Sequence, residues 1–205
     1  MHGECYNIAH EIKLNLQPTE FDKATFGVMA AEIRADPSVP MIFAPQTEYR
    51  EGPRPEGDTD QISLLGRCHP DFRRLEPSEL PEGIQHGAKF TCILIDTPHY
   101  LPWLVKRFEG NGGQIYRATL TSLGAALSVS PQLASASAIV NCTGLGAIDL
   151  IGDKDVFPTR GQLVIVRAPW VKEGRTRLGP GVYTYTIPRK SGHVVIGGSA
   201  DANDW

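Results

Sequence analysis

Residues 138–147 read Ala-Ile-Val-Asn-Cys-Thr-Gly-Leu-Gly-Ala, and residues 182–189 read Val-Tyr-Thr-Tyr-Thr-Ile-Pro-Arg. The first stretch is a short apolar run that ends in a glycine-bearing turn, a pattern typical of a buried strand in a nucleotide-binding α/β sheet. The second stretch carries two tyrosines at alternate positions, which is typical of a hairpin strand. The chain therefore changes from one kind of sheet to another between these two stretches.

Strands and helices alternate in the region that leads up to the first stretch. Apolar runs predict strands over residues 90–95, 114–120 and 138–142. Thr97 is a suitable N-cap and Pro98 a suitable first residue for a helix between the first two of these strands. A weak helical turn is predicted over residues 122–127. This order of elements predicts a crossover unit with parallel strands.

The rest of the chain predicts one long helix and an antiparallel sheet. The helix covers residues 20–34, and its apolar stripe consists of Phe21, Ala24, Val28, Ala31 and Ile33. The strands cover residues 41–44, 163–166, 182–187 and 193–197, with a hairpin turn at 190–192. Residues 46–61 are rich in proline, glycine and acidic side chains, so we expect a mobile surface loop there. The predicted fold class is mixed α/β.

The composition is that of an ordinary globular protein, with 41% hydrophobic and 21% charged residues. The net charge of -3 gives no reason to expect nucleic acid or an acidic membrane surface as a partner. No apolar run approaches the roughly 20 residues that span a bilayer. The cysteines and histidines show no metal-ligand spacing, so no metal site is predicted.

Two motifs can carry chemistry, and each also fits an ordinary structural role. Gly144 allows the backbone to approach a ligand closely, and Thr143 offers a hydroxyl and an amide. A strand that simply ends in a glycine turn accounts for the same residues, and from spacing alone this structural role is preferred. Tyr183 and Tyr185 can hold a carboxylate or shape an apolar slot, but half-buried strand aromatics give the same pattern.

Familiar catalytic motifs are missing from the sequence. It contains no GxSxG elbow, no Walker loop and no HExxH motif. The histidines are scattered mostly in predicted loops. We therefore predict no catalytic acid, base or nucleophile from the residues.

Taken together, these pieces resemble the D-amino acid oxidase family of FAD-dependent enzymes. No single motif is specific to the family, but the set follows the family's order from about residue 20 to the end of the chain. The matching segments are residues 23–26, 71–75, 79–83, 95–104 (IDTPHYLPWL), 112–113, 140–147 (VNCTGLGA), 160–162, 185–189, 197–198 and 204–205.

The resemblance implies an FAD-binding Rossmann-like domain and a substrate domain built on a mixed, largely antiparallel sheet. It implies that a D-amino acid loses its α-hydrogen as hydride to FAD, and that O2 reoxidises the flavin to give hydrogen peroxide. The imino acid then hydrolyses to a 2-oxo acid and ammonia. In such an enzyme the cofactor carries the chemistry, which agrees with the missing acid–base motif.

The resemblance also assigns roles to individual residues. Thr143, with its neighbours Cys142 and Gly144, matches a cofactor contact of the family. Thr119 and Leu120 match the strand that lies beside the adenine.

On the substrate side, Tyr185 matches the tyrosine that binds the substrate carboxylate. Tyr183 lies close to the position of a second active-site tyrosine, although its spacing differs from that of the family.

The resemblance divides the chain and exposes two departures from the family. It assigns residues 18–95 and 161–205 to the substrate domain and residues 96–160 to the FAD-binding domain, and leaves 1–17 as a poorly patterned terminus.

The GxGxxG turn that seats the FAD pyrophosphate is absent from the sequence. The arginine that clamps the substrate carboxylate would lie beyond residue 205. We therefore expect an internal fragment that lacks both ends of the enzyme.

Three functions follow from the resemblance and its departures. The first is FAD-dependent D-amino acid oxidation, with O2 as the second substrate. The second is an inactive remnant that does not hold FAD, because the pyrophosphate turn is missing. The third is a D-aspartate oxidase, which needs an additional cationic group for the side-chain carboxylate. The family also implies a peroxisomal or cytoplasmic location and offers a homodimer as one assembly.

Overall fold

The computed structural model describes residues 18–53 and 61–204. Within these ranges the chain forms two compact units, residues 18–104 with 161–199 and residues 105–160 with 200–204. The predicted N-terminal segment 1–17, residues 54–60 of the expected loop, and Trp205 lie outside the described residues. The chain thus leaves the first unit after Leu104, returns to it at Gly161 and leaves it again after Ser199.

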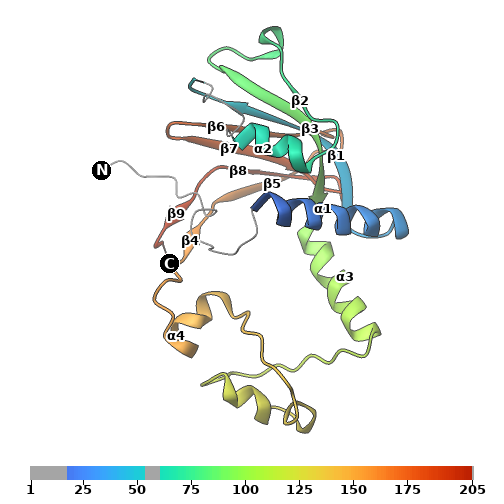
Figure 1. Ribbon diagram of the computed structural model, residues 1–205, viewed down its shortest axis with the longest axis vertical. Helices are drawn as coiled ribbons and strands as arrows, with labels where there is room; N and C mark the ends of the chain where they lie inside the picture. Colours follow the sequence, from blue (N-terminus) through green and yellow to red (C-terminus); the bar gives the residue numbers. More distant parts are fainter. Residues whose placement is uncertain (1–17, 54–60, 205) are drawn as a thin grey trace. The chain divides into compact units, whose positions relative to one another are not determined.

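A mixed sheet dominates the first unit (Figure 1). Within the described ranges it has seven strands in the order β2-β3-β1-β6-β7-β8-β5. Neighbouring strands are antiparallel except β1 and β6, which run parallel. The strands are β1 (Met41–Arg50), β2 (Arg73–Arg74), β3 (His86–Ile95), β5 (Leu163–Arg167), β6 (Gly174–Gly179), β7 (Val182–Pro188) and β8 (His193–Gly197). The prediction of a mixed α/β fold with a largely antiparallel sheet is confirmed.

Two strands differ from their predicted forms. β1 continues to Arg50, where a loop was expected, because it pairs with β3 along its whole length, from Met41 opposite Ile95 to Arg50 opposite His86. β6 was not predicted at all. Its sequence contains two arginines and only one large apolar residue, Leu178, so it lacks the apolar alternation that marks a strand.

The core of this unit lies between the sheet and two helices, α1 (Pro18–Ala35) and α2 (Gln61–Cys68), which contact β3 and one another (Figure 1). One cluster of buried side chains there consists of Ala44, Phe90, Cys92 and Leu94. The predicted stripe on α1 is wrong in detail, because Val28 is 63% exposed whereas Ala30 is 2% exposed. The helix turns the side that carries Ala30 and Phe26 toward the sheet, where the Phe26 ring lies 6.3 Å from that of Phe43.

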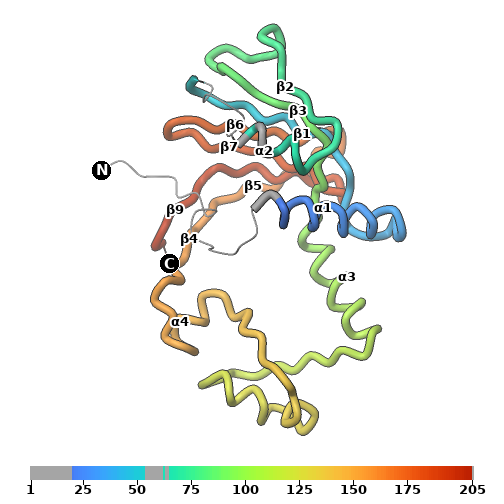
Figure 2. Tube along the Cα trace, viewed as in Figure 1, coloured from blue at the N-terminus to red at the C-terminus, as the bar shows by residue number. Residues whose placement is uncertain are grey.

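The second unit contains little regular structure. α3 (Thr97–Gly110) begins in the first unit and ends in the second, and its start at Thr97 and Pro98 is as predicted. Figure 2 shows the irregular path that follows α3, which passes through the short 3-10 turns η3 (Gly124–Ser128), η4 (Pro131–Leu133) and η5 (Gly144–Gly146). α4 (Ala147–Ile151) comes next, and β4 (Thr159–Arg160) pairs with β9 (Asp201–Ala202). Among the helices of the described ranges, none has an apolar stretch that could span a bilayer.

The predicted strands over residues 114–120 and 138–142 do not form. In the part of the chain that the structure describes, neither segment pairs with another strand, so the predicted parallel crossover unit is absent there. A strand requires a neighbour to satisfy its backbone N–H and C=O groups. Val140, in the middle of the second segment, is 82% exposed, as expected for an apolar run that has no such neighbour.

Candidate functional site

Two tyrosines project from one face of β7 in the first unit. The rings of Tyr183 and Tyr185 lie 5.4 Å apart between centroids and are tilted by 53°. Among the described residues, the Tyr185 hydroxyl has no hydrogen-bond partner. A phenol with a free hydroxyl on a half-buried ring can donate a hydrogen bond to an anionic ligand.

Two glycines at the end of β8 and just after it leave room for these tyrosines. Tyr185 lies opposite Gly197 in the β7–β8 ladder. A Cβ at position 197 would lie 2.5 Å from the Tyr185 hydroxyl oxygen, and a Cβ at Gly198 would collide with the carbonyl oxygen of Tyr183. Both positions therefore require glycine if the ring of Tyr185 and the backbone of β7 are to stay where they are.

A polar pair that was not predicted from the sequence lies beside Tyr185. Thr176 of β6 is the direct partner of Tyr185 in the antiparallel ladder, so both side chains lie on the same face of the sheet. The Gln46 Nε2 group donates a hydrogen bond to Thr176 Oγ1 at 3.0 Å. The sequence signal that could have indicated this hairpin is Gly179-Pro180-Gly181, which links β6 to β7 in a turn where Gly181 has a φ of 70°.

A buried carboxylate fixes the turn of the hairpin that carries the tyrosines. Asp96 is 2% exposed, and its Oδ2 atom accepts a hydrogen bond from the Ser191 backbone N–H at 3.0 Å. Its Oδ1 atom lies 3.1 Å from His99 Nδ1. Burial alone would raise the pKa of Asp96, but the hydrogen bonds from Ser191 and His99 outweigh it and hold the pKa below its ordinary value.

Lys190, in the same turn, also fixes the hairpin, through contacts with a different segment of the chain. Its ammonium donates to the backbone oxygens of Pro37, at 2.5 Å, and Val39, at 2.7 Å. The hairpin is thus anchored both to the start of α3 and to the segment between α1 and β1.

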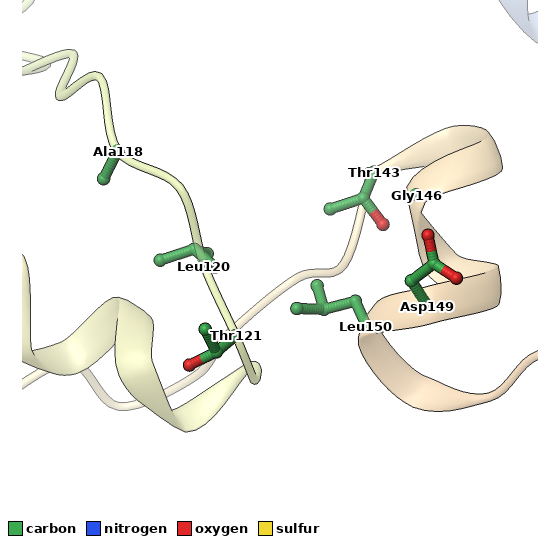
Figure 3. A pocket seen from close by; sticks show the side chains of 7 residues that line it. All are labelled: Ala118, Leu120, Thr121, Thr143, Gly146, Asp149 and Leu150. Atoms are coloured by element: carbon green, nitrogen blue, oxygen red, sulfur yellow. The ribbon is translucent and has the colours of Figure 1, made fainter.

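A hollow with a volume of about 540 Å³ lies in the second unit. Figure 3 shows its lining side chains on two segments that face one another, one before η3 and one that includes η5 and α4. The lining residues are Ala118, Leu120, Thr121, Thr143, Gly146, Asp149 and Leu150. The leucines give it apolar walls, and the threonine hydroxyls and the Asp149 carboxylate give it polar groups.

The predicted cofactor residues fall at this hollow or beside it. Leu120 and Thr143, which are far apart in the sequence, both line it. Thr119, Cys142 and Gly144 are exposed neighbours of these two residues and are not among the lining residues.

The turn that carries Thr143 has a defined geometry. Thr143 Oγ1 donates a hydrogen bond to Asn141 Oδ1 at 2.8 Å. Gly144 has a φ of 56°, in the left-handed region that favours glycine. Asp149, which was not predicted from the sequence, lies in the first turn of α4 just after the glycine turn.

Comparison with known proteins identifies the family. The sequence profile of the family described as FAD dependent oxidoreductase matches residues 44–205. The chain belongs to this family. The family uses FAD, as the resemblance in the sequence implied.

Several relatives of established name share this family. The chain is 40% identical to the D-aspartate oxidase of Homo sapiens over 149 residues, which cover 72% of this chain and 41% of that protein. It is 34% identical to the D-amino-acid oxidase of Schizosaccharomyces pombe over 188 residues, 90% of this chain and 52% of that protein. It is 38% identical to the D-aspartate oxidase of Cryptococcus neoformans over 169 residues, 73% of this chain and 42% of that protein. The chain thus spans about half the length of these relatives.

A solved structure shares the fold. The glycine oxidase of Bacillus cereus superposes with a TM-score of 0.53 at 18% sequence identity, covering 99% of this chain and 61% of the oxidase. This likeness concerns the fold alone, and it agrees with the mixed α/β architecture described above.

Proposed function

We propose that this chain acts in the FAD-dependent oxidative deamination of D-amino acids. The observation that carries the proposal is the Tyr185 hydroxyl on β7, which lies against the backbone of Gly197 and has no hydrogen-bond partner among the described residues, in a chain of the FAD dependent oxidoreductase family. The D-amino-acid oxidase and D-aspartate oxidases to which the chain is similar supply the substrate class.

On the substrate side, Tyr185 acts as a hydrogen-bond donor. Its hydroxyl donates to the α-carboxylate of the amino acid, which fixes that end of the substrate relative to the sheet. The neighbouring ring of Tyr183 limits the space on one side. Thr176 and Gln46 offer polar groups on the same face.

On the cofactor side, the hollow of the second unit suits the adenosine part of a dinucleotide. Its volume of about 540 Å³ lies in the range of small-molecule sites, roughly 300–1,000 Å³. Leu120 contributes an apolar wall for the adenine. The hydroxyl and the backbone N–H of Thr143 both donate to Asn141 Oδ1, so Thr143 offers the cofactor its hydroxyl oxygen as an acceptor. Asp149 can accept hydrogen bonds from ribose hydroxyls.

Three further residues flank these contacts. Thr119 adjoins Leu120, and Cys142 and Gly144 flank Thr143, so they complete the two segments that meet the cofactor. FAD, when bound, supplies the acceptor for the α-hydride and the reaction with O2 that gives hydrogen peroxide.

Assembly and location are further predictions from the family resemblance. We propose a peroxisomal or cytoplasmic location and a homodimer. Imaging of a fluorescent fusion tests the location, and sedimentation equilibrium tests the assembly.

The experiment that tests the function uses the purified chain with added FAD. Absorption after desalting measures flavin retention, and a peroxidase-coupled assay measures hydrogen peroxide with D-alanine, D-aspartate and L-alanine. We expect a yellow protein that forms peroxide with a D-amino acid and not with L-alanine. A colourless protein that forms no peroxide with either D-amino acid would contradict the proposal.

A further inference from the structure

A second hollow, with a volume of about 470 Å³, lies in the first unit on the face of the sheet opposite the tyrosine pair. Thr186 lines this hollow and directly follows Tyr185 in β7. Successive side chains of a strand point to opposite faces, so a ligand here would not meet the tyrosine face. This hollow is therefore separate from the substrate site proposed above.

The floor and one wall of this hollow are apolar and accessible. Val166 and Ile196 contribute to the floor and are 37% and 41% exposed. Trp170, at one side, is 76% exposed, which is unusual for so large an apolar side chain. Exposed apolar surface of this kind in a concave site is characteristic of ligand binding.

The turn that presents Trp170 is held in place by backbone hydrogen bonds. Val171 N–H donates to the carbonyl oxygen of Ala168 at 3.0 Å, which closes the turn around the tryptophan. Ala168 N–H donates to the carbonyl oxygen of Gly192 at 3.0 Å, which ties the turn to the β7–β8 hairpin. The ring is thus carried by a fixed segment, and binding against it requires little ordering of the backbone.

The polar rim of the hollow has an excess of positive charge. Lys172, Glu173 and Arg175 line it. The Glu173 carboxylate accepts a hydrogen bond from the Thr47 hydroxyl and lies 3.5 Å from Lys89 Nζ, so its charge is already balanced. Arg175 has a side chain that is 63% exposed and lies 4.0 Å from Glu173. Arg175 and Lys172 therefore remain available to an anion.

We propose that this hollow binds a monocarboxylate with an extended apolar body, such as a medium-chain fatty acid. The hydrocarbon body lies on Val166, Ile196 and the ring of Trp170. The carboxylate meets the guanidinium of Arg175 and the ammonium of Lys172. Apolar burial supplies most of the affinity, and the two cations select the anion over an uncharged analogue.

Isothermal titration of the full chain with decanoate tests this site, with decanol as the uncharged comparison. We expect decanoate to bind, and decanol to bind about tenfold more weakly because it cannot pair with the cations. The double variant Lys172→Gln/Arg175→Gln should weaken decanoate binding by about tenfold and leave decanol binding unchanged. Trp170→Ala should weaken both ligands.

Two control variants show whether the binding is specific to this hollow. Arg177→Gln removes a cation from the same strand that does not line the hollow, and it should leave decanoate binding unchanged. Tyr185→Phe, which tests the proposed substrate site, should also leave it unchanged, so the two proposals fail independently. Absence of decanoate binding overturns this proposal, and so does equal binding by the double variant. Sedimentation that shows two copies joined by this face, with Trp170→Ala restoring the monomer, would also overturn it.

Discussion

The ring of Tyr185 lies against the backbone of Gly197, so closely that a Cβ at position 197 would be 2.5 Å from both the Cζ and the hydroxyl oxygen of the tyrosine. The same Cβ would be 2.8 Å from Leu163 Cδ2 on the other neighbouring strand. The absence of a Cβ at Gly197 thus leaves the space that the Tyr185 ring occupies.

Gly197→Ala should therefore displace the Tyr185 ring. We expect a loss of about 1–3 kcal/mol in unfolding free energy from overpacking, together with a higher KM for D-amino acids. Chemical denaturation and steady-state kinetics measure the two effects. Gly27→Ala is the matched control, because its Cβ meets nothing within 4 Å and alanine favours the helix. A Gly197→Ala variant as stable as the native chain would show that the ring moves freely.

Tyr185→Phe removes the hydroxyl and keeps the ring. If that hydroxyl binds the substrate carboxylate, KM should rise by roughly tenfold to a hundredfold, the equivalent of one hydrogen bond to a charged group, while kcat falls less. Steady-state kinetics with D-alanine provides the measurement. Tyr183→Phe should have a smaller effect on KM, and an unchanged KM in Tyr185→Phe would rule out the carboxylate role.

Asp96→Ala should loosen the β7–β8 turn. The variant loses the hydrogen bond from the Ser191 amide, and we expect the unfolding free energy to fall by about 1–3 kcal/mol. Hydrogen exchange at the Ser191 amide should accelerate. Because the folded-state pKa of Asp96 lies below 3.8, its stabilisation is present above about pH 4 and is lost as the pH falls through the folded-state pKa.

Asp153→Ala is the control for this variant. Asp153 Oδ1, in the second unit, accepts a hydrogen bond from the Asp155 backbone N–H at 2.9 Å, so the variant loses the same kind of hydrogen bond without changing one of the Ser191 amide. Slower exchange at Ser191 in Asp153→Ala than in Asp96→Ala is the expected result, and equal rates would contradict the role assigned to Asp96.

His69 should make stability depend on pH between about 7 and 5. Its ring lies 4.9 Å from Phe90 and 5.5 Å from Phe26, and burial lowers its pKa below 6.5. In the unfolded chain, His69 takes up a proton near pH 6.5. In the folded chain, burial opposes protonation of this ring. The unfolding free energy should therefore fall as the pH decreases through this window.

Denaturation of the native chain and of His69→Phe over this pH range measures the effect. The phenylalanine variant retains the aromatic contacts and should show a flatter pH profile. The difference between the two profiles isolates His69 from the other histidines, and identical slopes would show that His69 does not titrate differently on folding.

Elements with local signals were predictable from the sequence. Thr97 and Pro98 indicated the start of α3, and the apolar runs indicated β5 and β8. The turn between β7 and β8 was also correct, since Gly192 takes a φ of 83° there. In each case the residues that determine the element lie inside it or next to it.

Elements that depend on distant partners were not predictable. β6 is a strand because it lies between β1 and β7, and its own residues give little sign of it. The hydrogen bond from Gln46 to Thr176 cannot be inferred without that pairing. Conversely, residues 114–120 have a strand-like sequence but no partner within the described residues. Of the candidate site, motif resemblance indicated Tyr185 and Thr143, whereas Asp149 was found only from the structure.

The parallel pairing of β1 with β6 has a consequence for how the protein is made. This pairing brings together residues that lie far apart in the sequence, such as Gln46 and Thr176, which are 130 positions apart. While the chain emerges from the ribosome, β1 and β3 can pair early, but one edge of β1 must wait until β6 has been synthesised. Contacts of such long range slow folding and prolong the exposure of an open edge. The segment between β1 and β6 must therefore be synthesised before β6 can pair with β1 and complete the sheet.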